Sequence, residues 1–401
     1  MSDDRRHALV IGAGLAGAAA CSALARRGWR ITLVDAAAGP ALGASGLPVG
    51  MLSPHVTRSP TPLSRLSALG VADTLDELQR LLPQGAGWQA CEVDNLGHDP
   101  GRWPAALVRP AALVQAWLDE ARSRSSLDCR WNAPVAQLRA VPTNDPSSPV
   151  IWQAWDAQGS LVAQAPVVIV AAALGSLDLL VGAQTGLAHH DLPLRPVKGQ
   201  MSLAALEGPA LADRPRRNEG VFVPRYEDPG LAPRWPTTIW AMGSTYERGL
   251  CDTRVTAEAH ERNACSLQAI QPEAAQRLRT ALGNDRLDGW AQVRCASLDR
   301  LPLVGAAPDT QALGKLMTAG RPPRPRVQLA DVPRWPGLHL LSAMGSRGLT
   351  LAHWCAEQLA AQLSGETTSA DADLLQSLDP ARFALKAARR QGTARVPPTA
   401  G

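Results

Sequence analysis

The sequence contains little from which a metal centre or a disulfide framework could be built. Its seven cysteines are an odd number, they are scattered along the chain, and no two of them form a Cys-x-x-Cys pair. This pattern favours neither a disulfide-bonded secreted fold nor a zinc site, and it fits a protein of the reducing cytoplasm. We therefore expect no metal site.

A strong excess of one charge is also missing. Lysine and arginine number 40 against 36 aspartates and glutamates, which gives a net charge of +4. A charge this small permits a polyanionic partner without requiring one. With 45% apolar and 19% charged residues over 401 positions, the chain is typical of a globular protein that can bury a large core.

Long apolar runs are few. Arg5-Arg6 precedes the uncharged run 8–25, which could be mistaken for a twin-arginine signal or a membrane span. Glycines at fixed spacing lie inside that run and a strand pattern follows it, so we interpret it as part of a folded domain. The run 165–177 is too short to span a bilayer. We expect neither export nor membrane insertion.

The glycines of that run form a nucleotide-binding pattern. Gly12, Gly14 and Gly17 follow a strand-like run and open an alanine-rich helix. In this fingerprint the first glycine permits a tight turn, the second lets the backbone approach a pyrophosphate, and the third lets helix and strand pack closely. Asp35 ends the next strand-like run, where a carboxylate can accept hydrogen bonds from ribose hydroxyls. The alternative, a glycine-rich packing turn, would leave Asp35 unexplained.

FAD and NAD share this fingerprint, and other segments distinguish them. The turn Gly43-Ala44-Ser45-Gly46 with Gly50-Met51, the run Pro196-Val197-Lys198-Gly199-Gln200, and the turn Gly345-Ser346-Arg347-Gly348-Leu349-Thr350 occur in this order. Together they resemble marker segments of the D-amino-acid-oxidase-like flavoproteins. That resemblance implies FAD as the cofactor. The candidate cofactor-binding residues are Gly12, Ala13, Gly14, Leu15, Ala16, Gly17, Asp35, Gly43, Ala44, Ser45, Gly46, Gly50, Met51, Val135, Gly345, Ser346, Arg347, Gly348, Leu349 and Thr350.

A closer resemblance covers roughly residues 7–363. The segments that carry it are Ala41-Leu42-Gly43-Ala44-Ser45-Gly46, Ser64-Arg65-Leu66-Ser67, Val293-Arg294-Cys295-Ala296, Asp299-Arg300-Leu301-Pro302-Leu303-Val304-Gly305, the Gly345 turn and Cys355-Ala356-Glu357. They look like the FAD-dependent half of the bifunctional bacterial tRNA 5-methylaminomethyl-2-thiouridine biosynthesis proteins. Two departures stand out. The methyltransferase domain of that family is missing, which indicates a stand-alone oxidase half or a fragment. Leu47-Pro48 stands where an asparagine usually follows the glycine turn.

The resemblance implies an α/β fold in which a mixed α+β substrate domain is inserted into an FAD-binding Rossmann-like, D-amino-acid-oxidase-like domain. The expected divisions are residues 1–85 and 331–370 for the FAD domain, 86–195 for a part that alternates between the domains, 196–330 for the substrate domain and 371–401 for a peripheral tail. The pattern predicts helices over 113–122, 257–282 and 351–363, and strands over 166–173 and 338–341.

The resemblance also implies a reaction. It is the removal of the carboxymethyl group from 5-carboxymethylaminomethyl-(2-thio)uridine at the wobble position of tRNA. Hydride transfer from the glycine α-carbon to flavin N5 and hydrolysis of the imine would release glyoxylate and leave the 5-aminomethyl nucleoside. The expected partners are tRNA as substrate and a separate tRNA methyltransferase.

The carboxylate of such a substrate needs a planar, permanently charged clamp, which arginine provides. Arg294 and Arg347 are the candidates, because related glycine-type oxidases place carboxylate-binding arginines at matching positions; surface or structural ion pairs are the alternative. Tyr246 could bind the same carboxylate or be a half-buried core tyrosine. Gln200 and His55 are weaker pocket candidates, and Cys295 is expected to be a small buried residue.

Two groups of arginines could meet phosphates, or could be solvated loops. They are Arg214, Arg216, Arg217 and Arg225, and Arg321, Arg324, Arg326 and Arg334. Two other functions stay open at this point. One is a small-molecule oxidase of glycine, sarcosine or a D-amino acid, and the other is a non-catalytic flavoprotein partner of a tRNA methyltransferase.

Overall fold

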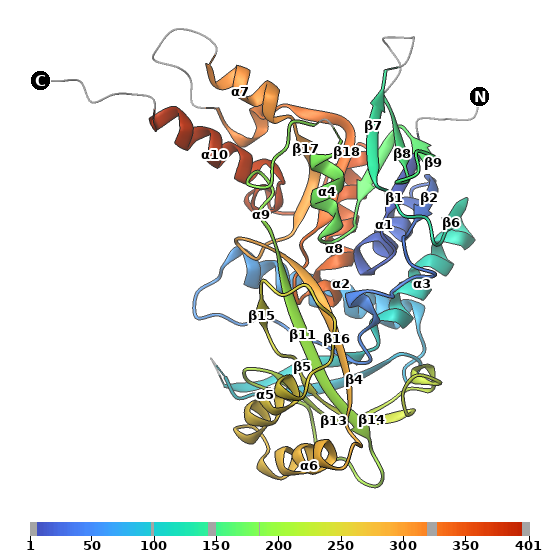
Figure 1. Cartoon of the computed structure of the whole chain (residues 1–401), viewed down its shortest axis with the longest axis vertical. Coiled ribbons are helices and arrows are strands. Elements are labelled where there is room, and N and C mark those ends of the chain that lie inside the picture. Colours follow the sequence, from blue (N-terminus) through green and yellow to red (C-terminus); the bar gives the residue numbers. More distant parts are fainter. Residues whose placement is uncertain (1–5, 98–99, 143–149, 184, 319–326, 395–401) are drawn as a thin grey trace, which may run out of the picture.

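The computed structural model describes residues 6–97, 100–142, 150–183, 185–318 and 327–394, and for 391–394 it describes the backbone alone. Two large sheets organise this part of the chain. In Figure 1 the sheet with the N-terminal strand lies in the upper half, and the other sheet lies in the lower half. The strands β11 and β16 run between the two halves.

The upper sheet has six strands in the order β17-β18-β10-β1-β2-β6. These strands are β17 (Leu303–Pro308), β18 (Arg334–Ser342), β10 (Val167–Val170), β1 (His7–Ile11), β2 (Arg30–Val34) and β6 (Leu127–Arg130). All neighbours pair in parallel except β17 with β18. Parallel strands in this arrangement need long crossovers. A helix, α1, connects β1 to β2, whereas three short antiparallel strands, β7 to β9, connect β6 to β10.

Both faces of this sheet are covered, which explains its nearly continuous apolar strands. Ala8 and Val10 of β1 face a core shared with helices, whereas Leu9 and Ile11 face a second core. The helices are α1 (Leu15–Ala25), α2 (Pro62–Leu81), α3 (Pro110–Arg124) and α8 (Gly348–Leu363). The opposite face carries β7 (Gln137–Val141), β8 (Ile151–Trp155), β9 (Leu161–Ala165) and α4 (Gly175–Val181).

The lower sheet has nine strands, and its path runs β15-β11-β14-β13-β12-β4-β5-β3 with β16 paired to β11. The strands are β3 (Gly50–Leu52), β4 (Trp88–Asn95), β5 (Gly101–Val108), β11 (Leu194–Ala205), β12 (Arg216–Arg217), β13 (Val221–Glu227), β14 (Thr238–Gly243), β15 (Glu247–Arg248) and β16 (Asp288–Ser297). Two helices, α5 (Ala257–Gln268) and α6 (Pro272–Gly283), pack on one face through Phe222, Trp240 and Met242.

The single helix predicted over 257–282 is wrong, because Pro272 begins a second helix. A proline fits the first turn of a helix but breaks its interior. The other predicted helices and strands are present with bounds shifted by a few residues. The remaining elements are α7 (Thr310–Thr318), α9 (Ala372–Leu378), α10 (Ala381–Ala394) and the short turns η1 (Ala44–Gly46), η2 (Pro229–Leu231) and η3 (Leu329–Asp331).

A buried ionic network joins the helical layer. Glu120 on α3 accepts hydrogen bonds from Ser22 (2.7 Å), from Arg26 (2.7 Å) and from Arg80 (2.7 Å). Glu77 on α2 accepts from the same Arg26 (2.6 Å) and from Trp117 (2.9 Å). The network therefore ties α1, α2 and α3 together where no apolar contact could satisfy the carboxylates.

Replacing Glu120 with alanine is expected to lower the free energy of unfolding by about 3–5 kcal/mol at neutral pH, because it removes one of the two buried carboxylates that Arg26 and Arg80 share. Urea unfolding measures this change. The matched control is Glu261→Ala, which removes an exposed carboxylate paired with Arg279 and should change stability little. Equal losses in the two variants would show that the network does not stabilise the fold.

The same network predicts acid sensitivity. Burial alone would raise the pKa of the Glu120 carboxyl, but hydrogen bonds from Arg80, Arg26 and Ser22 hold it well below its ordinary value of 4.5. A pKa that is lower in the folded state stabilises the protein above the unfolded pKa, and this contribution is lost as the pH falls. The stability difference between the wild type and Glu120→Ala should therefore shrink below about pH 4.5.

Candidate functional site

The first glycine loop is closed to any side chain. Gly12 has φ of +107°, and a Cβ atom there would lie 2.6 Å from the carbonyl oxygen of Ala171, just beyond β10. A Cβ atom on Gly17 would lie 1.8 Å from the carbonyl oxygen of Gly12. The loop therefore turns tightly from β1 into α1.

Asp35 holds the same loop from the end of β2. Its Oδ2 atom accepts a hydrogen bond from the N–H of Ala13 (2.6 Å), and its Oδ1 atom accepts one from Ala37 (2.8 Å). The carboxylate is half-buried, and each of its oxygens has capacity for another donor. The predicted residue Val135 is partly buried. Its segment lies close to Asp35, because the N–H of Ala133 donates to the carbonyl of Asp35 (2.9 Å).

The second glycine loop, residues 43–46, hydrogen-bonds the first loop through a side chain. The hydroxyl of Ser45 in η1 accepts a hydrogen bond from the N–H of Leu15 (3.0 Å), so it caps α1 from outside the helix. A Cβ atom on Gly46 would lie 2.6 Å from the carbonyl oxygen of Ala41, which keeps this turn compact. Leu47, one of the departures from the family pattern, packs into the core of the lower sheet.

The third glycine turn, residues 345–350, contacts two strands of the lower sheet and the first glycine loop. The N–H of Gly345 donates to the carbonyl of Cys295 (2.8 Å) at the end of β16. A Cβ atom on Gly348 would lie 3.0 Å from the side chain of Leu15, and one on Gly50 would lie 2.6 Å from that of Leu349. The N-termini of α1 and α8 therefore adjoin at the glycine loops. The other predicted residues of these loops differ in exposure: Ser346 is exposed, Met51 is partly buried and Thr350 is buried.

Arg294 and Tyr246 lie on the lower-sheet side of this junction. The Nη2 atom of Arg294 donates to the carbonyl of Thr245 (2.7 Å), and its guanidinium carbon lies 5.4 Å from the centre of the Tyr246 ring. A Cβ atom on Gly199 would lie 1.6 Å from that Nη2 atom. The glycine of the predicted Lys198-Gly199-Gln200 marker therefore makes room for Arg294. Tyr246 is 49% exposed, so it is not the core tyrosine that the sequence also allowed.

Arg347 is the N-cap residue of α8 and is partly buried. Burial lowers the pKa of its guanidinium, and the positive charges of Arg300 and Arg217 lower it further. The charge that Tyr246 carries when ionised acts in the opposite direction on the pKa of both Arg347 and Arg294. Both arginines predicted to bind the carboxylate therefore interact with Tyr246, although the three residues lie in three separate segments.

The weaker candidates have clear positions. His55 lies beside the same arginines, and burial together with the charges of Arg347, Arg217 and Arg300 lowers its pKa to about 4, so its ring is neutral at pH 7. Gln200 is fully buried and both ends of its amide bond the backbone of Thr256. Cys295 is buried, as expected of a small packing residue, and burial raises the pKa of its thiol to about 11.

Most of the predicted phosphate-binding arginines have other partners. Arg214 and Arg225 lie near carboxylates of Asp94 (3.7 Å) and Glu227 (2.8 Å), and Arg334 pairs with Asp379 (2.7 Å). Arg216 donates to the carbonyl of Ile270 (3.1 Å). Arg321, Arg324 and Arg326 lie outside the described residues.

Arg217 differs from these, because it donates only to the neutral groups Ser53 (2.7 Å), Pro54 (2.9 Å) and Asn95 (3.1 Å). Arg300, which sequence reasoning treated only as part of a motif, lies in the same group. The sequence does not show that Arg300 lies near Arg217 and Arg347, because these residues are distant along the chain.

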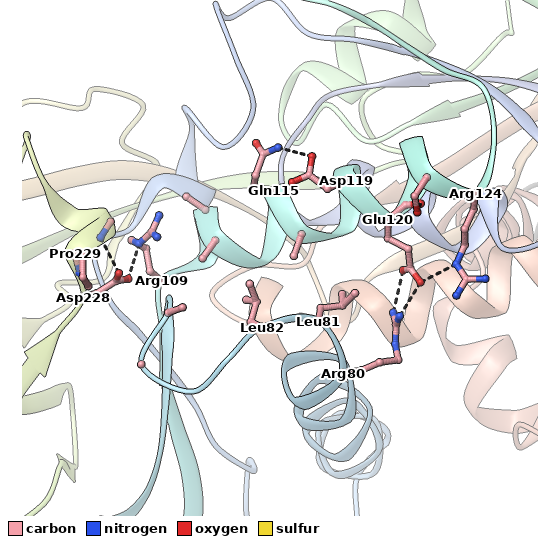
Figure 2. Close-up of a pocket in the computed structure, with 17 residues that line it drawn as sticks. Arg80, Leu81, Leu82, Arg109, Gln115, Asp119, Glu120, Arg124, Asp228 and Pro229 are labelled. Carbon is pink, nitrogen blue, oxygen red and sulfur yellow. Dashed lines mark hydrogen bonds and ion pairs between the residues drawn. The ribbon is translucent and has the colours of Figure 1, made fainter.

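A pocket of about 850 Å³ lies apart from these residues, along α3 and beside η2 (Figure 2). Its charged groups are already paired. Glu120 binds Arg80 and Arg124, and Asp228 binds Arg109 at 2.6 Å. None of the residues predicted to bind cofactor or substrate lines this pocket, so we do not assign the site to it.

Within the described part of the chain, no group of three or more His, Cys, Asp or Glu residues is arranged to hold a metal ion. No helix among the described residues has the length and apolar character needed to cross a membrane.

Comparison with known proteins gives a consistent result. The model of the family described as FAD dependent oxidoreductase (DAO) matches residues 7–105 and 101–362. The tRNA 5-methylaminomethyl-2-thiouridine biosynthesis bifunctional protein of Verminephrobacter eiseniae is 37% identical over 94% of this chain and 63% of its own length. Its counterpart in Paracidovorax citrulli is 35% identical over 94% of this chain and 60% of its own length. The chain thus spans less than two thirds of these relatives.

Solved structures agree on the fold. Glycine oxidase from Geobacillus kaustophilus superposes with a TM-score of 0.66 at 18% identity, covering 94% of this chain and 99% of that one. Glycine oxidase from Bacillus cereus gives a TM-score of 0.64 at 16% identity, covering 90% and 96%. The expectation of an α/β, D-amino-acid-oxidase-like fold is therefore confirmed.

Proposed function

Because this chain belongs to the family of FAD-dependent oxidoreductases, we propose that it oxidises the carboxymethylaminomethyl group on the wobble uridine of tRNA. The products would be the 5-aminomethyl-(2-thio)uridine and glyoxylate. The observation that carries this proposal is the meeting of Arg294, Arg347 and Tyr246 beside the glycine loops, with no carboxylate paired to either arginine among the described residues. The names of the bacterial relatives support the tRNA substrate.

The glycine loops fit FAD. Gly12 and Gly17 permit the tight turn into α1, and the N–H groups and partial positive charge at the N-terminus of that helix favour phosphate. Asp35 offers acceptors for ribose hydroxyls, and Gly348 places the N-terminus of α8 alongside. When bound, FAD supplies the two-electron acceptor for the oxidation of a C–N bond.

The arginines would hold the glycine unit by its carboxylate. Arg294 is anchored by Thr245 and by the Tyr246 ring, so its planar fork is held in one orientation before substrate arrives. Binding of the carboxylate by Arg294 and Arg347 would fix the α-carbon and the amine relative to the glycine loops. Tyr246, half-exposed beside Arg294, would provide a further hydroxyl donor.

The positive charge of the arginines has a second effect on the substrate. A secondary amine must be neutral when its α-carbon is oxidised, and nearby cations disfavour its protonated form. Arg294 and Arg347 would therefore lower the pKa of the bound amine. The oxidation turns the CH–NH unit into an imine, and addition of water splits that imine into glyoxylate and the primary amine.

Nucleoside mass spectrometry of tRNA from cells that lack this protein tests the proposal. We expect 5-carboxymethylaminomethyl-(2-thio)uridine to accumulate and the downstream nucleosides to disappear. Unchanged nucleoside composition would refute the tRNA substrate. The primary amine is a substrate for methylation, so we propose that a methyltransferase acts after this chain, in the cytoplasm where tRNA is modified.

A further inference from the structure

The candidate site carries more positive charge than a glycine unit can neutralise. A bound N-alkylglycine with a neutral amine brings a single carboxylate charge. Four arginines belong to this region. Arg294 and Arg347 lie on adjoining segments, because the N–H of Gly345 donates to the carbonyl of Cys295, and the charges of Arg217 and Arg300 act on Arg347. None of them forms an ion pair with a carboxylate among the residues described. Arg217, Arg294 and Arg347 are partly buried, and uncompensated buried cations are costly, which points to a ligand with further negative charge.

The chain path brings these cations together from four segments. Arg217 on β12 donates to Ser53 and to the carbonyl of Pro54, which places its guanidinium beside His55. Arg300 lies three residues beyond β16, and its N–H donates to the carbonyl of Ser297 (3.2 Å). Ala296 forms a bridge with Met344, so the end of β16 lies against the turn that bears Arg347.

Three acidic residues close in sequence to these segments are bound by other side chains. Asp299 accepts hydrogen bonds from Arg382 (2.9 Å) and from Ser297 (2.8 Å). Glu247 pairs with Arg262 (2.7 Å). Asp94, next to Asn95, lies near Arg102 (3.6 Å) and Arg214 (3.7 Å). The surplus charge is therefore not neutralised from within the described protein.

We propose that Arg217 and Arg300 form a phosphate-binding patch that receives the nucleic-acid backbone beside the modified nucleoside. This inference rests on the proposed function and deepens it, because it names the surface that would contact RNA. Arg217 keeps its Nη2 atom available, since its three neutral partners use Nε and Nη1. Arg300 is exposed and its guanidinium has no partner among the described residues, so it can meet a phosphate without breaking an internal contact.

The inner arginines and the outer arginines would bind two different anions of the same substrate. Arg294 and Arg347 are partly buried and suit the carboxylate that enters with the reacting group. Arg300 is exposed on the outer side of the same group, where a phosphodiester remains in contact with solvent. A free glycine would satisfy the inner pair alone, whereas a nucleotide within RNA would satisfy both.

The test uses the FAD-loaded full chain and the variant Arg300→Gln. We measure binding of an anticodon stem-loop RNA carrying the carboxymethylaminomethyl group by fluorescence anisotropy as a function of salt. Loss of one phosphate contact is expected to weaken binding about 5- to 10-fold at low salt and to lower the salt slope by about 0.7–0.9. Flavin reduction by the free nucleoside 5-carboxymethylaminomethyluridine, which has no phosphate, should be unchanged.

The matched control is Arg286→Gln. Arg286 is also exposed, but it precedes β16, whereas Arg300 follows it, and a strand of ten residues separates them by about 30 Å. This variant should bind the RNA like the wild type. If Arg300→Gln retains the wild-type affinity and salt slope while the wild type oxidises the RNA, the patch is refuted and the proposed function stands. If the wild type neither binds nor oxidises the RNA, both are refuted.

Discussion

Replacing Arg294 with methionine is expected to reduce kcat/KM for the carboxymethylaminomethyl substrate by about 10²- to 10⁴-fold, which corresponds to about 3–5 kcal/mol of lost transition-state binding. Methionine keeps much of the side-chain volume beside Gly199 and Tyr246 but removes the cation that would pair with the substrate carboxylate. FAD should stay bound, because Arg294 belongs to none of the glycine loops. Steady-state kinetics with the visible flavin spectrum as a check measure both effects.

Arg248→Met is the control for this experiment. Its guanidinium also lies near the Tyr246 ring, at 5.7 Å from the ring centre, but the residue is exposed on β15. It should keep kcat/KM within about twofold of the wild type, as surface charges are weakly coupled to a bound ion. A wild-type rate in Arg294→Met, or equal losses in the two variants, would remove Arg294 from the clamp.

Replacing Gly12 with alanine is expected to yield folded protein that no longer retains FAD, with an affinity reduced at least about 100-fold. The new Cβ atom would meet the carbonyl of Ala171 at 2.6 Å while φ stays at +107°. The collision and the unfavourable φ are relieved only if the loop moves. If it does not move, each costs about 1–3 kcal/mol of folding free energy. Flavin absorbance after gel filtration measures retention, and circular dichroism measures folding.

Gly28→Ala is the control for Gly12→Ala. It introduces the same side chain at a glycine of positive φ outside the predicted cofactor site. Gly28 also has positive φ, at +73°, but it follows the far end of α1, and a Cβ atom there would meet no other atom within 4 Å. This variant should lose about 1 kcal/mol of stability and keep its FAD. If Gly12→Ala binds FAD as tightly as Gly28→Ala does, the glycine loop is not the pyrophosphate site.

Local patterns predicted the fold well where one segment carries the whole signal. The strand, glycine turn and helix around Gly12 and Gly17 could be predicted because both glycines are required by local sterics. A Cβ atom at either position would collide with backbone in the same loop or just beyond the adjacent strand. The break at Pro272 was missed because the apolar spacing continues through it into α6. Gln200 looked like a pocket residue, yet both ends of its amide are bound to Thr256, a contact across 56 positions.

Long-range electrostatics could not be predicted from the sequence. Arg294 and Arg347 were placed by resemblance, and Tyr246 was proposed from its place in the sequence. The structure adds that Tyr246 acts on the pKa of both arginines, while the catalytic roles of all three stay a prediction. Arg217 and Arg300 were named in two separate sequence patterns, and nothing in the sequence placed both of them near Arg347, because the three residues are distant along the chain. The ionic network of Glu77 and Glu120 has the same origin, since its charges come from three helices.

Anaerobic mixing of the FAD-loaded protein with substrate tests the central claim most directly. The substrate is tRNA that carries 5-carboxymethylaminomethyluridine, and parallel samples contain fully modified tRNA or sarcosine. We predict loss of the visible flavin absorbance and release of glyoxylate with the first tRNA, and no change with the second. Bleaching by sarcosine alone would indicate a small-molecule oxidase, and a flavin that none of the three reduces would contradict oxidase activity on N-alkylglycines altogether.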